Sequence, residues 1–484
     1  MSHSATVGQQ SAHDVPPDPS RRWWVLVLLC VAQFMVILDV TVVNVALPQI
    51  ATDLDLDRTA LTWVITGYTL CFGGLMLLGG RMADALGRRP VFLAGLVIFT
   101  LASLGSGLAG TATLLVTARG AQGVGAALLS PAALSIVTTT FHGPDRNRAL
   151  GVWAAIGGAG AAVGVLLGGV FTAGPGWRWV FFINVPIGVL VAIAVPLVVG
   201  SGRAGQRAGR IDLPGALVAT LALGSLIYGL VRAGDTGWAE SGTLLALGVG
   251  VALLAVFVLV ERATAAPLVR LAVLTRQPVL AGNLVMLTAS GLLLSNFFLA
   301  SQYLQRVLGW GALDTGVLFL PIALVIGLGT HLGVRIVGRW GGRPAAASGF
   351  LLTAAGAWLL TGLPADGSAL LHVLPGFALS GLGLGAVFVT ATTTAMAHVE
   401  PHDAGMASGL INVGHELGAT LGIAVLSSIA AASLDAAPSG PAPVDGFGRA
   451  YLAAAVIAVI AAAVAGWLVP AGRPPATDGP IFAH

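Results

Sequence analysis

Three ionisable side chains stand inside long apolar stretches of this sequence: Asp39, Arg119 and Glu416. At the centre of a membrane helix an Arg or Asp costs about 2.5–3.5 kcal/mol on insertion scales, so each needs a partner or a function. Asp39 and Arg119 lie at similar distances from the predicted outer ends of their stretches, which places them at one depth. We therefore expect these two residues to pair.

An Asp–Arg pair at this depth can carry a proton. Arginine stays charged even when it is buried, whereas a buried aspartate that loses its partner favours the protonated form. Making and breaking the contact would then release and load a proton. The alternative is a permanent ion pair that only fixes helix packing, and the residues alone leave both open.

Glu416 belongs to a second polar group, because Asn412 lies one helical turn before it on the same face. This glutamate is either a second proton carrier or a recognition site for cationic ligands. The alternative is a neutral, hydrogen-bonded acid in a packed interface. His415 points about 100° away around the helix, and we expect it to be a packing residue.

A short charged segment after the second apolar stretch has the composition of a gate. It contains Arg81, Asp84, Arg88 and Arg89. A carboxylate here can lie against the amino-terminal dipole of a neighbouring helix, and the arginines can bridge to an acid such as Asp145. Contacts that form when the inner side closes and break when it opens would gate a pathway. The alternative is that the arginines only set the orientation in the membrane.

Aromatic residues deep in the apolar stretches are candidates for the wall of a substrate cavity, since they can pack on flat apolar compounds or stack on cations. Most members of such a set are expected to be ordinary core or lipid-facing side chains. The set comprises Trp63, Tyr68, Trp153, Phe297, Phe298 and Phe319, of which Trp63 and Tyr68, with Asn412 and Glu416, are the substrate-binding candidates.

Fourteen apolar stretches are long enough to position these residues in a bilayer, because roughly 20 helical residues cross its core. They predict an all-α integral membrane protein. The predicted spans lie near 23–48, 59–80, 90–108, 111–140, 148–172, 178–199, 213–233, 241–261, 278–301, 313–337, 344–363, 369–398, 404–431 and 449–469.

The distribution of charge predicts the orientation. All 23 basic residues are arginines; seventeen fall on one set of alternate connections and five on the other. Because loops rich in Lys and Arg stay in the cytoplasm, both termini are predicted to be cytoplasmic. Hydrophobic residues make up 56% of the chain and charged residues 9%, against about 25% charged in a soluble domain. This composition excludes a soluble enzyme.

Several kinds of cofactor and partner are not expected. Without lysine the chain cannot form a Gly-x-x-x-x-Gly-Lys nucleotide loop, so the proton motive force is the expected energy source. Cys30 and Cys71 fall inside spans and offer no disulfide or metal framework. The basic balance reflects inner arginines and gives no reason to expect nucleic acid.

The chain contains an internal repeat. The stretch from Arg81 to Pro90 after the second span resembles that from Arg335 to Pro344 after the tenth, at an offset of 254 residues. We therefore expect a tail at 1–22, a six-helix bundle at 23–200, a linker with two inserted helices at 201–277, a second six-helix bundle at 278–470 and a tail at 471–484. Residues 201–210, rich in Gly and Arg, are predicted to be a flexible linker.

Five local motifs carry a resemblance to a known family. They run from Leu38 to Pro48, Gly80 to Arg89, Arg119 to Gly125, Gly160 to Gly169 and Trp177 to Gly188. Together with the parallel six-span halves, they resemble the fourteen-span drug:proton antiporter branch of the major facilitator superfamily. The resemblance covers essentially the whole chain and implies a coupling role for Asp39 and Arg119.

The chain departs from the family's pattern at four positions. Val165 stands where a proline is usual in the antiporter motif, and Ala85 stands where arginine is common in the gating segment. Gly338 replaces the acid in the second copy of that segment, so gating by it should be one-sided. Glu416 stands where the family often has glutamine.

The expected function is proton-coupled export of amphipathic or cationic drugs and toxic compounds by alternating access. The alternatives are a dedicated exporter of one metabolite, such as an antibiotic or siderophore, a proton symporter, and a membrane sensor or scaffold. The expected partners are the lipid bilayer, a small drug-like substrate and protons. The expected setting is a bacterial cell (inner) membrane, with the protein as a monomer.

Overall fold

The computed structural model describes residues 19–56, 58–199, 212–264, 267–366, 368–397, 399–400, 403–434 and 444–472, and within them every regular element is a helix. The predicted linker 201–210, and most of both predicted tails, lie outside the described residues. The helices are α1 (Pro19–Asp53), α2 (Arg58–Leu86), α3 (Arg88–Gly107), α4 (Ala112–Thr140), α5 (Gly143–Ala173), α6 (Trp179–Phe182), α7 (Asn184–Val198), α8 (Leu213–Thr236), α9 (Ser241–Ala263), α10 (Leu271–Leu274), α11 (Gln277–Gln302), the π-helix η1 (Tyr303–Val307), α12 (Ala312–Trp340), α13 (Gly342–Leu359), the 3-10 helix η2 (Leu360–Gly362), α14 (Ala369–His372), α15 (Leu374–Ala395), α16 (Ala404–Leu434) and α17 (Asp445–Leu468).

The all-helical architecture follows from the apolar sequence, because lipid offers no hydrogen bonds and a helix satisfies its own backbone. At the starts of α4 and α8, side chains accept from the free amides. Thr111 accepts from Leu114 N at 3.3 Å ahead of α4, and Asp212 accepts from Gly215 N at 2.9 Å ahead of α8. These two helix starts are thus set locally, by polar residues next to apolar runs.

Thirteen helices in the described part are long and apolar enough to cross a membrane. The predicted fifth span forms α5, a helix of 31 residues that is not in that set. The all-α membrane class is confirmed, and the number of fourteen spans stays a prediction.

The connection after the second span differs from the prediction. Helix α2 continues to Leu86, beyond the predicted end of the second span at residue 80, so Asp84 lies on its last turn. The only residue between α2 and α3 is Gly87, which has a φ of 99°. Three other predicted spans contain a helix break or a change of helix type: α6 meets α7 at Ile183, α14 meets α15 at Val373, and α13 continues as η2.

The internal repeat is visible in the backbone. Gly87 between α2 and α3 has a φ of 99°, and Gly341 between α12 and α13 has a φ of 95°. These two glycines are separated by the same 254 residues as the repeated segments. A side chain is strained at such a φ, so the sharp turn requires glycine in both halves.

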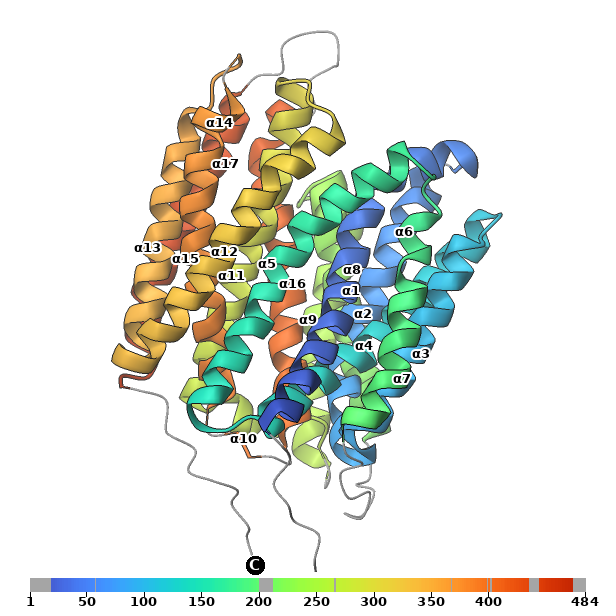
Figure 1. Cartoon of the computed structure of the whole chain (residues 1–484), viewed down its shortest axis with the longest axis vertical. Coiled ribbons are helices and arrows are strands. Elements are labelled where there is room, and N and C mark those ends of the chain that lie inside the picture. The colour runs from blue at the N-terminus through green and yellow to red at the C-terminus, as the bar shows by residue number, and fades with distance from the viewer. Residues whose placement is uncertain are drawn as a thin grey trace, which may run out of the picture.

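Two groups of helices lie side by side in Figure 1, with α13, α15 and α17 on the left and α3, α4 and α7 on the right. Across the seam, α12 packs against α5, and α16 packs against α2 and α4. Helix α8 contacts both α2 and α16, and α9 packs on α8. We call the end at which α1 begins and α2 ends the arginine-rich end; it is the lower end in Figure 1 and the predicted cytoplasmic side.

Glycine allows α1 and α5 to approach closely. Gly160, Gly164 and Gly168 form a stripe on α5, and a Cβ on Gly164 would overlap the side chain of Thr41 on α1. Small residues at helix contacts are a general device in membranes. The stripe therefore sets the position of the segment of α1 that carries Asp39.

We predict that Gly164→Ala lowers the stability of the folded protein by about 1–3 kcal/mol, because the added methyl group overpacks the α1–α5 contact. Gly466→Ala on α17 is the matched control, since a Cβ there meets nothing within 4 Å. Thermal unfolding of both purified variants measures the effect. Equal melting temperatures would show that α1 and α5 do not depend on this contact.

Candidate functional site

Asp39 and Arg119 form an ion pair inside the first group of helices, as their shared depth predicts. Asp39 comes from the middle of α1 and is 0% exposed; Arg119 comes from α4 and is 2% exposed. The contact joins Arg119 Nη1 to Asp39 Oδ2. A pair buried this completely requires additional hydrogen bonds to offset the loss of water.

Those additional bonds come from residues whose role the sequence did not reveal. Gln122 Nε2 donates to Asp39 Oδ1 at 3.0 Å, and Asn184 Nδ2 donates to the same oxygen at 2.9 Å. Gln122 Nε2 also donates to Ser103 Oγ at 2.7 Å. Helices α1, α4 and α7 therefore meet at one carboxylate, and Ser103 of α3 is linked to it through Gln122.

Arg119 is fixed on its other side by α2. Its Nε donates to the carbonyl oxygen of Val64 at 3.2 Å, and its Cζ lies 4.3 Å from the centroid of the Tyr68 ring. Tyr68 is 1% exposed, and its hydroxyl is buried without a hydrogen-bond partner. A buried hydroxyl without a partner is uncommon, and this one lies beside the ion pair.

Glu416 lies on the seam between the two helix groups. It is partly exposed on α16, and a Cβ on Gly73 of α2 would lie 3.9 Å from its Cβ. The charges of both Asp39 and Glu416 act on the Tyr68 phenol. The two candidate proton carriers thus both lie near Tyr68, one in a closed network and the other at an interface.

The neighbours of Glu416 differ in environment. Asn412 Nδ2 is buried without a hydrogen-bond partner. His415 lies against the Phe388 ring, with centroids 6.0 Å apart, and its carbonyl accepts a hydrogen bond from Ser290. His415 is therefore a packing residue in this conformation, as predicted from its direction on the helix.

The two aromatic candidates for substrate binding do not share a surface. Trp63 is 40% exposed and stacks on Tyr228 of α8, with ring centroids 6.2 Å apart. Tyr68 is five residues further along α2, which is roughly 140° around the helix, and it is buried beside Arg119. Trp63 thus faces an inserted helix, and Tyr68 faces the ion pair.

Asp84 ties the two helix groups together at the arginine-rich end. Its Oδ1 accepts from Gly405 N at 2.9 Å and its Oδ2 from Met406 N at 2.9 Å. These amides belong to the first turn of α16, where free N–H groups and the helix dipole attract a carboxylate. One turn earlier on α2, Gly80 lies directly against Gly405.

The arginines near Asp84 are arranged differently from the prediction. Arg81 and Arg88 both interact electrostatically with Asp84, and Arg89 is half-buried in the first turn of α3. None of the three bridges to Asp145 among the described ion pairs. Asp145 lies instead 4.0 Å from Arg22 and 3.3 Å from Arg148. The first turn of α5 places it nearer to these two side chains.

Arg146 provides another link across the seam, since its Nη2 donates to the carbonyl oxygen of Met396 at 2.8 Å. Together with the Asp84 contacts, this bond holds the arginine-rich end of the two groups together. The structure is therefore closed at that end. The capping contact of Asp84 has no equivalent at the matching position of the second half. Gly338, the counterpart of Asp84, has no carboxylate, and nothing lies within 4 Å of the position of its Cβ.

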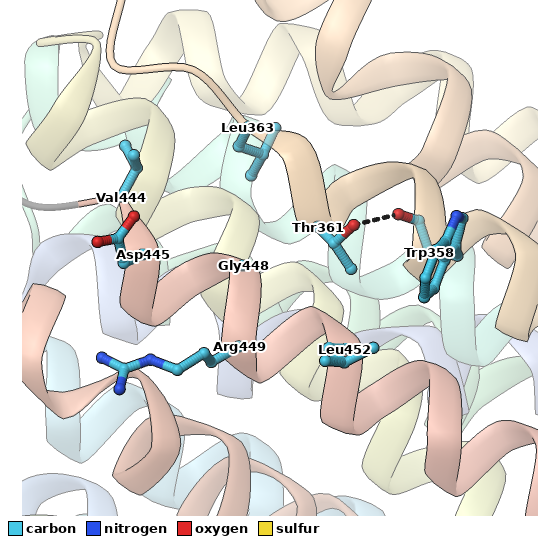
Figure 2. Close-up of a pocket in the computed structure, with 8 residues that line it drawn as sticks. All are labelled: Trp358, Thr361, Leu363, Val444, Asp445, Gly448, Arg449 and Leu452. Carbon is cyan, nitrogen blue, oxygen red and sulfur yellow. Dashed lines mark hydrogen bonds between the residues drawn. The ribbon is translucent and has the colours of Figure 1, made fainter.

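The pocket in Figure 2 is separate from these residues. It has a volume of about 420 Å³ and is lined by the end of α13, η2 and the start of α17, including Trp358, Asp445 and Arg449. None of the predicted site residues lines it. In the described part of the chain, no group of three or more His, Cys, Asp or Glu side chains is placed to hold a metal ion.

Solved structures show the same fold. The proton:xylose symporter XylE bound to 6-bromo-6-deoxy-D-glucose aligns with a TM-score of 0.66 at 15% identity, over 94% of this chain and 98% of that one. The human organic anion transporter MFSD10 aligns with a TM-score of 0.64 at 16% identity, over 93% and 100%.

Relatives in sequence are considerably closer. A puromycin resistance protein of Streptomyces alboniger is 40% identical over 98% of this chain and 96% of its own. A cephamycin export protein of Amycolatopsis lactamdurans is 39% identical over 92% of both. The protein-family model described as Major Facilitator Superfamily matches residues 29–423 of this chain. The chain belongs to the major facilitator superfamily of multi-pass membrane transporters, among relatives named for antibiotic resistance and export.

Proposed function

We propose that this transporter is a proton-coupled exporter of amphipathic or cationic antibiotics and other toxic compounds. The observation that carries the proposal is the network around Asp39, in which a carboxylate is buried at membrane depth beside an arginine. Relatives named for resistance and export support the direction of transport. The expected setting is a bacterial inner membrane, with both termini cytoplasmic and the protein acting as a monomer.

The proposed cycle uses the seam between the helix groups. In the closed-inside form Asp84 caps α16, and Asp39 is paired with Arg119 within its network. Opening of the arginine-rich end separates α2 from α16 and disturbs α2, whose Val64 and Tyr68 hold Arg119. A displaced Arg119 leaves Asp39 without its counter-ion, which favours uptake of a proton. Alternating between the two forms would exchange protons for substrate.

A second candidate is the dedicated export of one antibiotic. It is favoured by the names of the relatives, several of which specify a single compound, such as puromycin, cephamycin or lincomycin. Reconstitution in proteoliposomes with an imposed pH gradient distinguishes the two. A narrow range of compounds whose movement is coupled to internal pH would favour the dedicated exporter, and a broad range the multidrug exporter.

We predict that Asp39→Asn abolishes substrate-driven proton movement in proteoliposomes while the protein still folds. The amide keeps most of the shape of the carboxylate but cannot bind and release a proton at neutral pH. Asp314→Asn, at an exposed position in the first turn of α12, is the matched control and should transport normally. Proton movement at the wild-type rate in the Asp39 variant would contradict its role.

We predict that Glu416→Gln reduces the transport of cationic substrates at least tenfold more than that of neutral ones. The substitution removes the negative charge on the seam, and tenfold corresponds to about 1.4 kcal/mol of lost attraction. Initial transport rates for a matched pair of substrates, one cationic and one neutral, measure this difference. Glu240→Gln, outside the seam at the start of α9, is the control. Equal losses for both substrates would exclude a recognition role for Glu416.

We predict that Asp84→Asn makes the amides of Gly405 and Met406 exchange hydrogen faster. The amide side chain offers one oxygen acceptor where the carboxylate offers two, so one bond to α16 is lost. Hydrogen–deuterium exchange measured by mass spectrometry reports this first turn directly. Unchanged exchange in the variant would show that Asp84 does not hold the closed end.

A further inference from the structure

Two acidic side chains outside the transport site lie together at the arginine-rich end of the inserted helices. Asp212 immediately precedes α8 and is 6% exposed; Glu261 lies in the last turn of α9 and is 4% exposed. Carboxylates removed from water to this degree need compensation by partners. Neither residue takes part in the Asp39 network or in the capping of α16.

Each acid is satisfied at only one oxygen. Asp212 Oδ1 accepts from Gly215 N at 2.9 Å, and Glu261 Oε2 accepts from Val269 N at 3.0 Å. The other two oxygens, Asp212 Oδ2 and Glu261 Oε1, are buried without a hydrogen-bond partner. These backbone bonds hold both side chains in place and leave one free oxygen on each.

The two free oxygens lie near the same point, beside the Cα of Gly215. Asp212 Oδ2 would lie 2.5 Å, and Glu261 Oε1 2.7 Å, from a Cβ built on Gly215. Both atoms therefore occupy the space that a side chain at this position would fill. Glycine in the first turn of α8 is what allows the two carboxyl groups to converge.

One proton would satisfy both oxygens at once. Two ionised carboxylates without a donor repel each other, and a buried acceptor without a partner costs about 1–3 kcal/mol. A protonated carboxyl donates its O–H to the neighbouring carboxylate, which removes both penalties. The other charge that acts on Glu261 is Arg81, and the Nε of Arg81 is itself buried without a partner.

We propose that Asp212 and Glu261 form a second proton-binding site, a carboxyl pair that shares one proton. Binding adds a single proton to one of the two carboxylates; release leaves both ionised, with Arg81 as their counter-ion. A metal ion is disfavoured because Arg81 is close by, and because no third acidic, His or Cys ligand joins the pair among the described residues.

The pair is connected to the closed end of the transporter. Val269, whose N–H donates to Glu261, is followed by Arg270, which lies 3.2 Å from Asp403 just before α16. The backbone N–H of Arg270 donates to Met406 Sδ at 3.3 Å, and Met406 N is one of the two amides capped by Asp84. Loss of the shared proton would thus be transmitted through this connector to the start of α16.

Infrared spectroscopy of the full-length protein in lipid nanodiscs tests the shared proton without any transport assay. Wild type should show the C=O stretching band of a protonated carboxyl at neutral pH, and the same band should vanish in both Asp212→Asn and Glu261→Gln. The new amide donates to the remaining carboxylate, which then stays ionised. Asp39→Asn and Glu416→Gln should leave this band unchanged. A band that survives both pair substitutions would overturn the proposal.

Hydrogen exchange at the Val269 amide provides a second readout. Wild-type protection should rise as the pH rises and the shared proton is lost, after correction for intrinsic exchange, because an ionised Glu261 is the stronger acceptor for the Val269 N–H, whereas protection in Glu261→Gln should not depend on pH. The side-chain amide introduced by this substitution retains an oxygen for the Val269 N–H, so folding is preserved. Thermal stabilisation of wild type by Mg²⁺ or Ca²⁺, absent in the variant, would identify a metal site and overturn the assignment to a proton.

Discussion

One buried carboxylate constrains the architecture of the first group of helices. Asp39 is fully enclosed, and its oxygens receive donors from α4 and α7, namely Arg119, Gln122 and Asn184. Burial of a charge in a membrane is tolerable only if every donor is in place. The glycine stripe on α5, which lets α1 approach closely, and the contact of Arg119 with α2 both serve this requirement.

Helix α16 connects that site to the closed end of the molecule. Its first turn is capped by Asp84 of α2, and about three turns later it carries Glu416 against the same helix. A movement that removes the cap would therefore also change the surroundings of Glu416. Because α2 also holds Arg119 through Val64 and Tyr68, a single seam between two helices links all three candidate groups.

The inserted helices are more than a linker between two halves. Helix α8 contacts α2 on one side of the seam and α16 on the other, and the connector after α9 reaches the start of α16 through Arg270. The free oxygens of Asp212 and Glu261 lie at the arginine-rich end of the inserted helices α8 and α9. Helices that bridge both groups are in a position to sense or restrict their relative movement.

The sequence by itself determined the membrane class, the helices and the repeat. Hydropathy, arginine distribution and glycine spacing are local properties of each segment, and the bilayer acts on each segment through them. It also placed Asp39 and Arg119 at one depth. Only the tertiary structure decided the rest: Asn184 as a partner of Asp39, the separation of Trp63 from Tyr68, Arg22 and Arg148 as partners of Asp145, and the convergence of Asp212 with Glu261. Depth along a helix follows from counting residues, but which faces meet depends on how helices distant in sequence rotate and pack against one another.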